Sequence, residues 1–180
     1  MSGIPDFLTS YDFLASVRRR SIMPVESLID QLRRSKSCKV LPTQGIPDVD
    51  MPIPADVEGF YRLCGGAILY EGADYSIEIV PPCDFLRANP IIVGEDCSND
   101  RSYDWFTIAR TESDYLTIDL NPARFGRCYD SFRDCHGIAG NCQVVATGFE
   151  SLLKQLIDSH GEYWYWLKPG FRNLGDAYES

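Results

Sequence analysis

The sequence predicts an α+β fold: a twisted, mainly antiparallel β-sheet with helices packed at its face and ends. Three observations lead to this prediction. Apolar residues recur with helical spacing near both ends of the chain, over 25–32 and 149–157. Between these stretches, short apolar segments follow one another, separated by turn residues. The segment 115–120 alternates apolar and polar side chains, which is typical of an antiparallel sheet with one buried face.

Composition and charge limit the classes of partner. The chain has 180 residues, of which 44% are hydrophobic, so it is long and apolar enough to form a full core. It carries 17 basic and 26 acidic side chains, for a net charge of −9. Residues 1–36 hold six basic and four acidic side chains, whereas the remainder is strongly acidic. The acidic excess argues against nucleic acid and membrane surfaces as partners and favours a basic protein.

The cysteines and the apolar runs predict a cytoplasmic protein. The chain has seven cysteines, an odd number, and no Cys-x-x-Cys pair, so we expect reduced thiols rather than disulfides. The arginines at 18–20 are followed within a few residues by Pro24, which does not fit a secretory signal. No run reaches the roughly 18 apolar residues that a membrane span needs.

The chain is expected to divide into three parts. Residues 1–36 form an N-terminal segment of two helices, and the second begins near Pro24, a favourable first-turn residue. Residues 37–54 are rich in proline and glycine and are predicted to be a linker or irregular loop. Residues 55–180 form the acidic α+β body.

Within the body, a helix is predicted to begin at Pro54 and to end at Gly65-Gly66. The final helix follows Thr147, which has capping-box spacing to Glu150. We expect a tryptophan of the aromatic segment 163–166 to pack in the core. Between the helices, the pattern predicts strands at 67–70, 75–80, 91–93, 105–109, 116–120, 127–132 and 143–146, with a short helix at 83–87.

The chain offers little for metal or catalytic chemistry. Zinc could in principle be bound by the side chains of Cys128, Cys135, His136 and Cys142. Apart from the adjacent Cys135-His136, however, their spacing contains no compact ligand pair. The loop 96–107 alternates Asp and Ser as a calcium loop does, yet it lacks the required glycine and the bidentate glutamate. We therefore expect no catalytic residues, no metal and no cofactor.

An acidic patch around an aromatic residue is the strongest candidate for a site. Carboxylates beside a tryptophan can pair with a basic protein while the ring serves as an anchor. The candidate partner-binding residues are Asp96, Asp100, Asp104, Trp105, Glu112 and Asp114.

Several segments taken together resemble the SUKH superfamily. Ile53-Pro54 and the helix that ends in Phe60–Gly66 are similar to the proline–helix–glycine opening of that superfamily. The resemblance covers roughly residues 24–160. The other matching segments are the strand 105–109, the strand 116–120 with Gly126 and Cys128-Tyr129 after it, and the closing strand 144–146 with the helix from Phe149 to Leu153.

This resemblance implies a non-catalytic protein-binding domain. Many bacterial members are immunity proteins that bind and neutralise a cognate toxin, often a nuclease, and an acidic body suits a basic toxin. Fungal relatives act in cell-wall signalling, so a regulatory scaffold that uses residues 1–36 as an extra module is an alternative. A second alternative is a small-ligand or metal-binding protein with a site near Cys128, Cys135 and His136.

Overall fold

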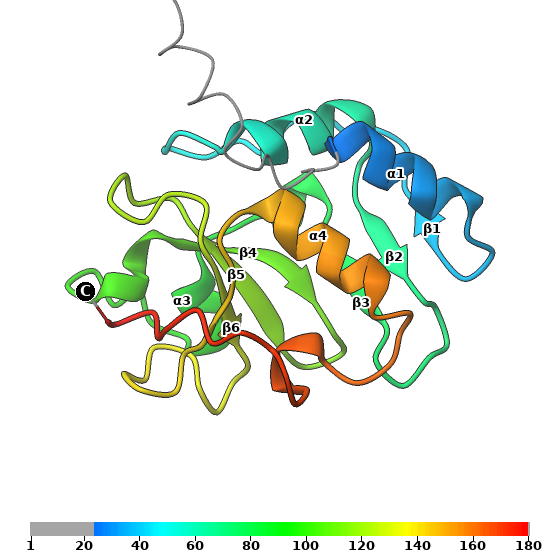
Figure 1. Cartoon of the computed structure of the whole chain (residues 1–180). Helices are drawn as coiled ribbons and strands as arrows, with labels where there is room; N and C mark the ends of the chain where they lie inside the picture. The colour runs from blue at the N-terminus through cyan, green and yellow to red at the C-terminus, as the bar shows by residue number, and fades with distance from the viewer. Residues whose placement is uncertain (1–23, 180) are drawn as a thin grey trace, which may run out of the picture.

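The computed structural model describes residues 24–179 and shows an α+β fold built on one antiparallel sheet (Figure 1). The strands lie in the sheet in chain order, each paired antiparallel with the next. They are β1 Lys39–Val40, β2 Ala67–Leu69, β3 Ile77–Ile79, β4 Trp105–Arg110, β5 Tyr115–Asp119, β6 Cys128–Ser131 and β7 Val144–Ala146. The α-helices are α1 Val25–Arg34, α2 Ala55–Leu63, α3 Ala88–Ile92 and α4 Phe149–Asp158.

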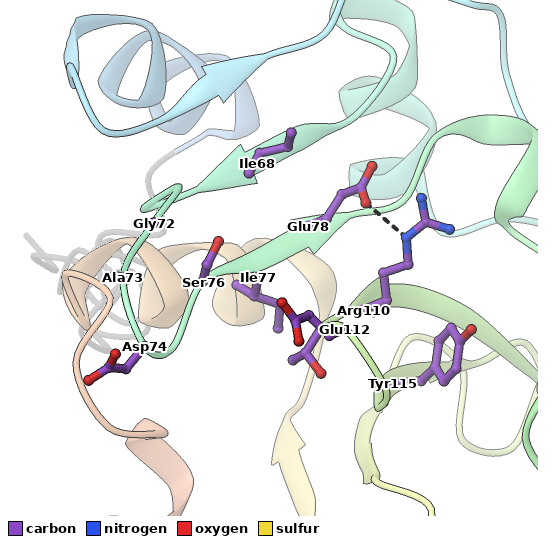
Figure 2. Close-up of a pocket in the computed structure, with 11 residues that line it drawn as sticks. Ile68, Gly72, Ala73, Asp74, Ser76, Ile77, Glu78, Arg110, Glu112 and Tyr115 are labelled. Atoms are coloured by element: carbon purple, nitrogen blue, oxygen red, sulfur yellow. Dashed lines mark hydrogen bonds and ion pairs between the residues drawn. The ribbon is translucent and has the colours of Figure 1, made fainter.

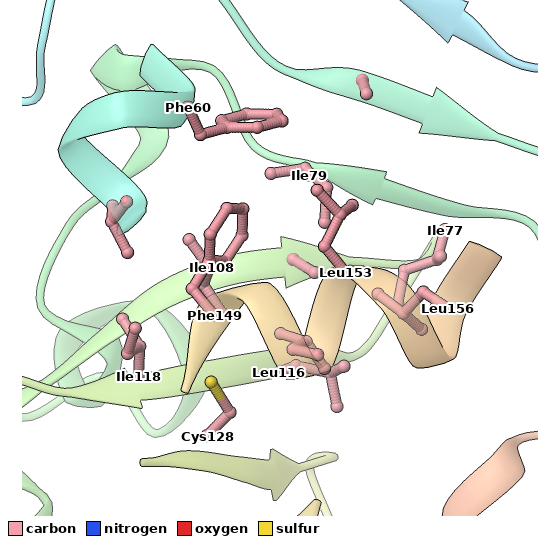
Figure 3. Packing of buried hydrophobic residues seen from close by; sticks show 14 of the residues in the cluster. Phe60, Ile77, Ile79, Ile108, Leu116, Ile118, Cys128, Phe149, Leu153 and Leu156 are labelled. Carbon is pink, nitrogen blue, oxygen red and sulfur yellow. The ribbon is translucent and has the colours of Figure 1, made fainter. Parts of the chain in front are cut away.

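Helices α1, α2 and α4 pack together over one face of the sheet (Figure 1). Each carries an apolar stripe at helical spacing, and those stripes are buried in the main core. Figure 3 shows the centre of this core, where Phe149 of α4 meets Phe60 of α2. Their rings contact edge to face with centroids 5.1 Å apart, an arrangement that aromatic pairs favour.

The opposite face of the sheet is also partly covered, contrary to the prediction of a single buried face. Trp105, Thr117 and Tyr129 point away from the three helices, and all three are fully buried. A second, smaller core forms there between the sheet, α3 and the C-terminal segment around Ala177. This segment also lies along the edge of β7, where the Val144 amide donates to the Gly175 carbonyl (2.9 Å) and Gln143 bridges to Asp176.

The order and type of most elements are confirmed, and the differences have local causes. Residues 91–93 are not a strand, because Ile91 and Ile92 belong to helix α3 and Val93 is its C-cap residue. The predicted helix at 83–87 is reduced to a 3-10 turn at Pro82–Asp84. The Thr147 capping box is wrong, since Gly148 is the N-cap residue and Asp56 of α2 accepts the hydrogen bond from the Glu150 amide (3.0 Å).

The described residues that precede helix α2 pack against the rest of the chain. Helix α1 contacts α2 and α4, and its apolar stripe lies in the main core. The expected linker contains β1, and its later residues Val49, Met51 and Ile53 pack against the same core. The first of the two helices predicted in 1–36 lies outside the described residues.

The Gly65-Gly66 pair explains how α2 passes directly into β2. A Cβ atom at Gly65 would lie 2.1 Å from the Pro42 carbonyl oxygen. Gly66 has a φ of +122°, and a Cβ there would lie 2.8 Å from the Ile79 carbonyl oxygen. Only glycine allows this close approach of three backbone segments.

Candidate functional site

An open groove lies at one end of the sheet, between the β2–β3 turn and the β4–β5 turn (Figure 2). Its volume is about 840 Å³. Strand pairing places Ile68, Glu78, Arg110 and Tyr115 directly beside one another on four neighbouring strands. Since cross-strand partners share a face, these side chains form one row. The intervening residues Ile77, Ile79 and Leu116 are buried in the main core, so the row lies on the face away from α1, α2 and α4.

An ion-pair network fixes the floor of the groove. Arg110 donates from Nε to Glu78 and from Nη1 to Asp84, both at 2.8 Å. Burial alone would lower the pKa of Arg110, but the two carboxylates outweigh burial and raise it. All three side chains keep some exposure, so the network contributes about 1 kcal/mol or less per pair and mainly sets the geometry.

The rim of the groove carries uncompensated negative charge. Asp74 lies in the β2–β3 turn and Glu112 in the β4–β5 turn, and both are exposed. Among the described residues, neither carboxylate has an ion-pair partner within 4.0 Å. The groove thus holds three carboxylates against the single cation Arg110. Together with the half-buried ring of Tyr115, this lining suits a positively charged group with an apolar stem.

The predicted partner-binding residues fall at two separate places. Glu112 lines the groove, and Asp114 lies in the same turn, where it accepts a hydrogen bond from the Arg133 amide (2.9 Å). Asp96, Asp100 and Asp104 lie beyond the other end of β4. A strand of six residues spans about 20 Å, so the two groups do not form one patch.

Trp105 is not an exposed anchor, and that part of the prediction is wrong. The side chain is fully buried in the second core. Its Nε1 donates to Asp119 at 3.0 Å, and its ring packs on Tyr129 with centroids 4.5 Å apart. The position after a polar loop suggested exposure, but β4 is a central strand with both faces covered here.

Two of the remaining aspartates are engaged within the molecule. Asp100 accepts hydrogen bonds from the Ser102 amide (2.8 Å) and from the Tyr178 hydroxyl (2.6 Å). Burial would raise the pKa of Asp100, but these hydrogen bonds prevail and lower it. Asp104 accepts from Asn121 (2.8 Å) and lies 3.8 Å from Arg87. Asp96 is exposed.

The proposed zinc ligands are not brought together. Cys128 faces the helices in the main core, whereas Cys142 lies in the second core on the other side of the sheet. Within residues 24–179, no group of three or more His, Cys, Asp or Glu side chains is placed to hold a metal ion. None of the helices described there is long and apolar enough to cross a membrane.

His136 is a buried histidine of the second core. It is 5% exposed, its Nε2 lies 2.8 Å from Asn89 Oδ1, and its Nδ1 has no hydrogen-bond partner among the described residues. Because Asn89 Oδ1 is an acceptor, Nε2 carries the proton of the neutral ring. Burial lowers the pKa of His136 from 6.5 to about 4, although the nearby charge of Asp100 opposes this shift.

Acid is therefore expected to destabilise the protein partly through His136. The unfolded chain takes up this proton below about pH 6.5 and the folded chain only near pH 4, so stability is lost as the pH falls through that window. The loss approaches about 3 kcal/mol at its limit. Urea unfolding at pH 7 and pH 4.5 should show a smaller pH effect for His136→Gln than for wild type. His160→Gln, at an exposed site, serves as the control, and equal pH effects in all three proteins would contradict the assignment.

Sequence reasoning missed most of the groove. Asp74, Glu78, Arg110 and Tyr115 come from three separate segments, and their proximity depends on strand register. The alternation of Tyr75, Ile77 and Ile79 with polar residues does indicate that Glu78 faces away from the core. It does not indicate which strands lie beside β3.

The sequence of this chain is 46% identical over 161 residues to that of a protein named immunity protein YokJ from Bacillus subtilis (strain 168). The match covers 88% of this chain and 98% of that relative. No protein-family model matches the chain.

Proposed function

Since this chain belongs to the family of the immunity protein YokJ, we propose that it is itself an immunity protein that binds and neutralises a cognate toxin. The observation that carries the proposal is the extent of the match, which covers nearly the whole of the relative at 46% identity. The α+β architecture of an antiparallel sheet with helices on one face further supports assigning this family to the SUKH superfamily.

Neutralisation would proceed by binding rather than by catalysis. The groove offers carboxylates, an arginine and a tyrosine. Of its two aliphatic hydroxyls, Ser76 donates to the Leu69 carbonyl (3.2 Å), and Thr111 accepts from the amides of Ser113 (3.4 Å) and Asp114 (3.2 Å). Neither hydroxyl is hydrogen-bonded to a carboxylate of the groove, as an activated nucleophile would be to its base. An acidic surface on an acidic protein suits a basic toxin, because complementary charge speeds encounter.

The cysteines support action in a reducing compartment, which we take to be the cytoplasm. All seven are free thiols. Burial raises the pKa of the Cys142 thiol to about 12 and that of Cys128 well above its usual value, so neither is a reactive thiolate at neutral pH.

The test is deletion of the gene in the strain that carries it, followed by growth in a mixed culture with the parent strain. We expect the deletion strain to lose viability beside its parent and to recover with a plasmid copy of the gene. Unimpaired growth of the deletion strain in the mixture would contradict an immunity function.

A further inference from the structure

We propose that the groove between the β2–β3 and β4–β5 turns is the toxin-binding surface, and that it receives a basic, arginine- or lysine-bearing segment of the toxin. This inference rests on the proposed immunity function and identifies the surface and the chemistry of its occupant. We define the groove surface as Asp74, Glu78, Arg110, Glu112 and Tyr115.

The first argument is the distribution of charge in the groove. Arg110 is held by Glu78 and Asp84 and is therefore already neutralised. The carboxylates of Asp74 and Glu112 remain without an ion-pair partner in the described part of the chain. They lie on the two turns that flank the groove (Figure 2), so a cation entering between them would meet negative charge from both sides.

The second argument is that this face of the sheet is covered at one end and exposed at the other. Near α3, the same face is closed by the segment around Ala177, which forms the second core. Over β2, β3 and the adjoining ends of β4 and β5, the row Ile68, Glu78, Arg110 and Tyr115 is left half-exposed. A guanidinium or ammonium group could pair with the rim while its aliphatic stem lies against Ile68 and Tyr115.

The acidic loop at the other end of β4 is the weaker choice. Its aromatic residue is buried, and Asp100 and Asp104 already accept hydrogen bonds within the molecule. Glu95 and Asp96 are exposed there, at the far end of the strand. They therefore offer a matched control with the same charge in a different place.

The proposal is tested by returning variants to the deletion strain. D74K/E112K reverses the two rim charges, and E95K/D96K changes the net charge equally at the control site. We expect D74K/E112K to lose protection against the parent strain and E95K/D96K to protect as wild type does. If wild type protects and D74K/E112K protects equally, the groove is not the toxin-binding surface although the immunity function stands. If wild type itself fails to protect, the proposed function fails.

A direct binding measurement tests the groove chemistry independently of the toxin. Purified full-length proteins, checked for folding by circular dichroism, are titrated into fluorescein-labelled oligoarginine at low salt. We expect D74K/E112K to bind about tenfold or more weakly than wild type, and E95K/D96K to bind within about twofold of it. Equal weakening by both variants would mean that binding follows net charge alone and would overturn the proposal. A dimer mass in sedimentation that D74K/E112K abolishes would also overturn it, since the groove would then hold a second copy of the chain.

Discussion

Replacement of Asp119 by alanine is expected to lower the free energy of unfolding by about 3–5 kcal/mol. Asp119 is fully buried, and its Oδ2 accepts hydrogen bonds from Arg124 Nε (2.7 Å), Tyr129 OH (2.9 Å) and Trp105 Nε1 (3.0 Å). Its Oδ1 accepts from the Asn121 amide (2.8 Å). Removing the carboxylate leaves the buried donors of Trp105 and Tyr129 unsatisfied and the partly buried Arg124 without its ion-pair partner.

Urea unfolding at neutral pH measures this effect. Asp119→Asn keeps the shape of the side chain and part of its hydrogen bonding, so it should lower the free energy of unfolding less than Asp119→Ala does. Asp48→Ala is the control, because Asp48 is exposed and makes no hydrogen bond or ion pair in residues 24–179. A loss of less than about 1 kcal/mol for Asp119→Ala would show that this network does not hold the β4–β6 end of the sheet together.

The second large effect is expected from Phe149→Ala, which should also cost about 3–5 kcal/mol. Phe149 opens helix α4, is fully buried, and packs on Phe60 of α2 (Figure 3). Truncation leaves a cavity where two helices meet the sheet, and rigid strands on one side limit collapse. Thermal and urea unfolding should show the loss.

Leu63→Ala provides the control for the core variant. Leu63 ends helix α2 and is 38% exposed, so its truncation should cost about 1 kcal/mol or less. Equal losses at Leu63 and Phe149 would contradict the placement of Phe149 at the centre of the main core.

The elements that sequence periodicity predicted well are those with one apolar face. The stripes of α1 and α4 each reflect burial on a single side. The alternation in β5 predicted the strand correctly, although its polar side chains Thr117 and Asp119 are buried as well. The prediction of a strand at 91–93 was wrong because the short run Ile91-Ile92-Val93 is β-branched, and β-branched residues favour strands. The packing of Ile92 in the second core, which local sequence does not show, is what favours the helix. The helix-capping prediction failed for a similar reason, since Asp56 comes from a distant segment.

The candidate site was predictable only in part. Glu112 was identified because it is a charged residue in an evident turn, and it does line the groove. The polar loop before Trp105 favours an exposed position for its side chain, but the side chain is buried because strand β4 is covered on both faces. Glu78, Arg110 and Tyr115 become neighbours through the register of three strands, which local patterns do not encode.

The most direct test of the account is hydrogen exchange of the protein alone and in complex with the toxin that kills the deletion strain. The account predicts slower amide exchange in the turns 71–76 and 111–114 on binding, with no change over 95–104. Protection confined to 95–104, or absent from both turns, would contradict the assignment of the groove as the toxin-binding surface.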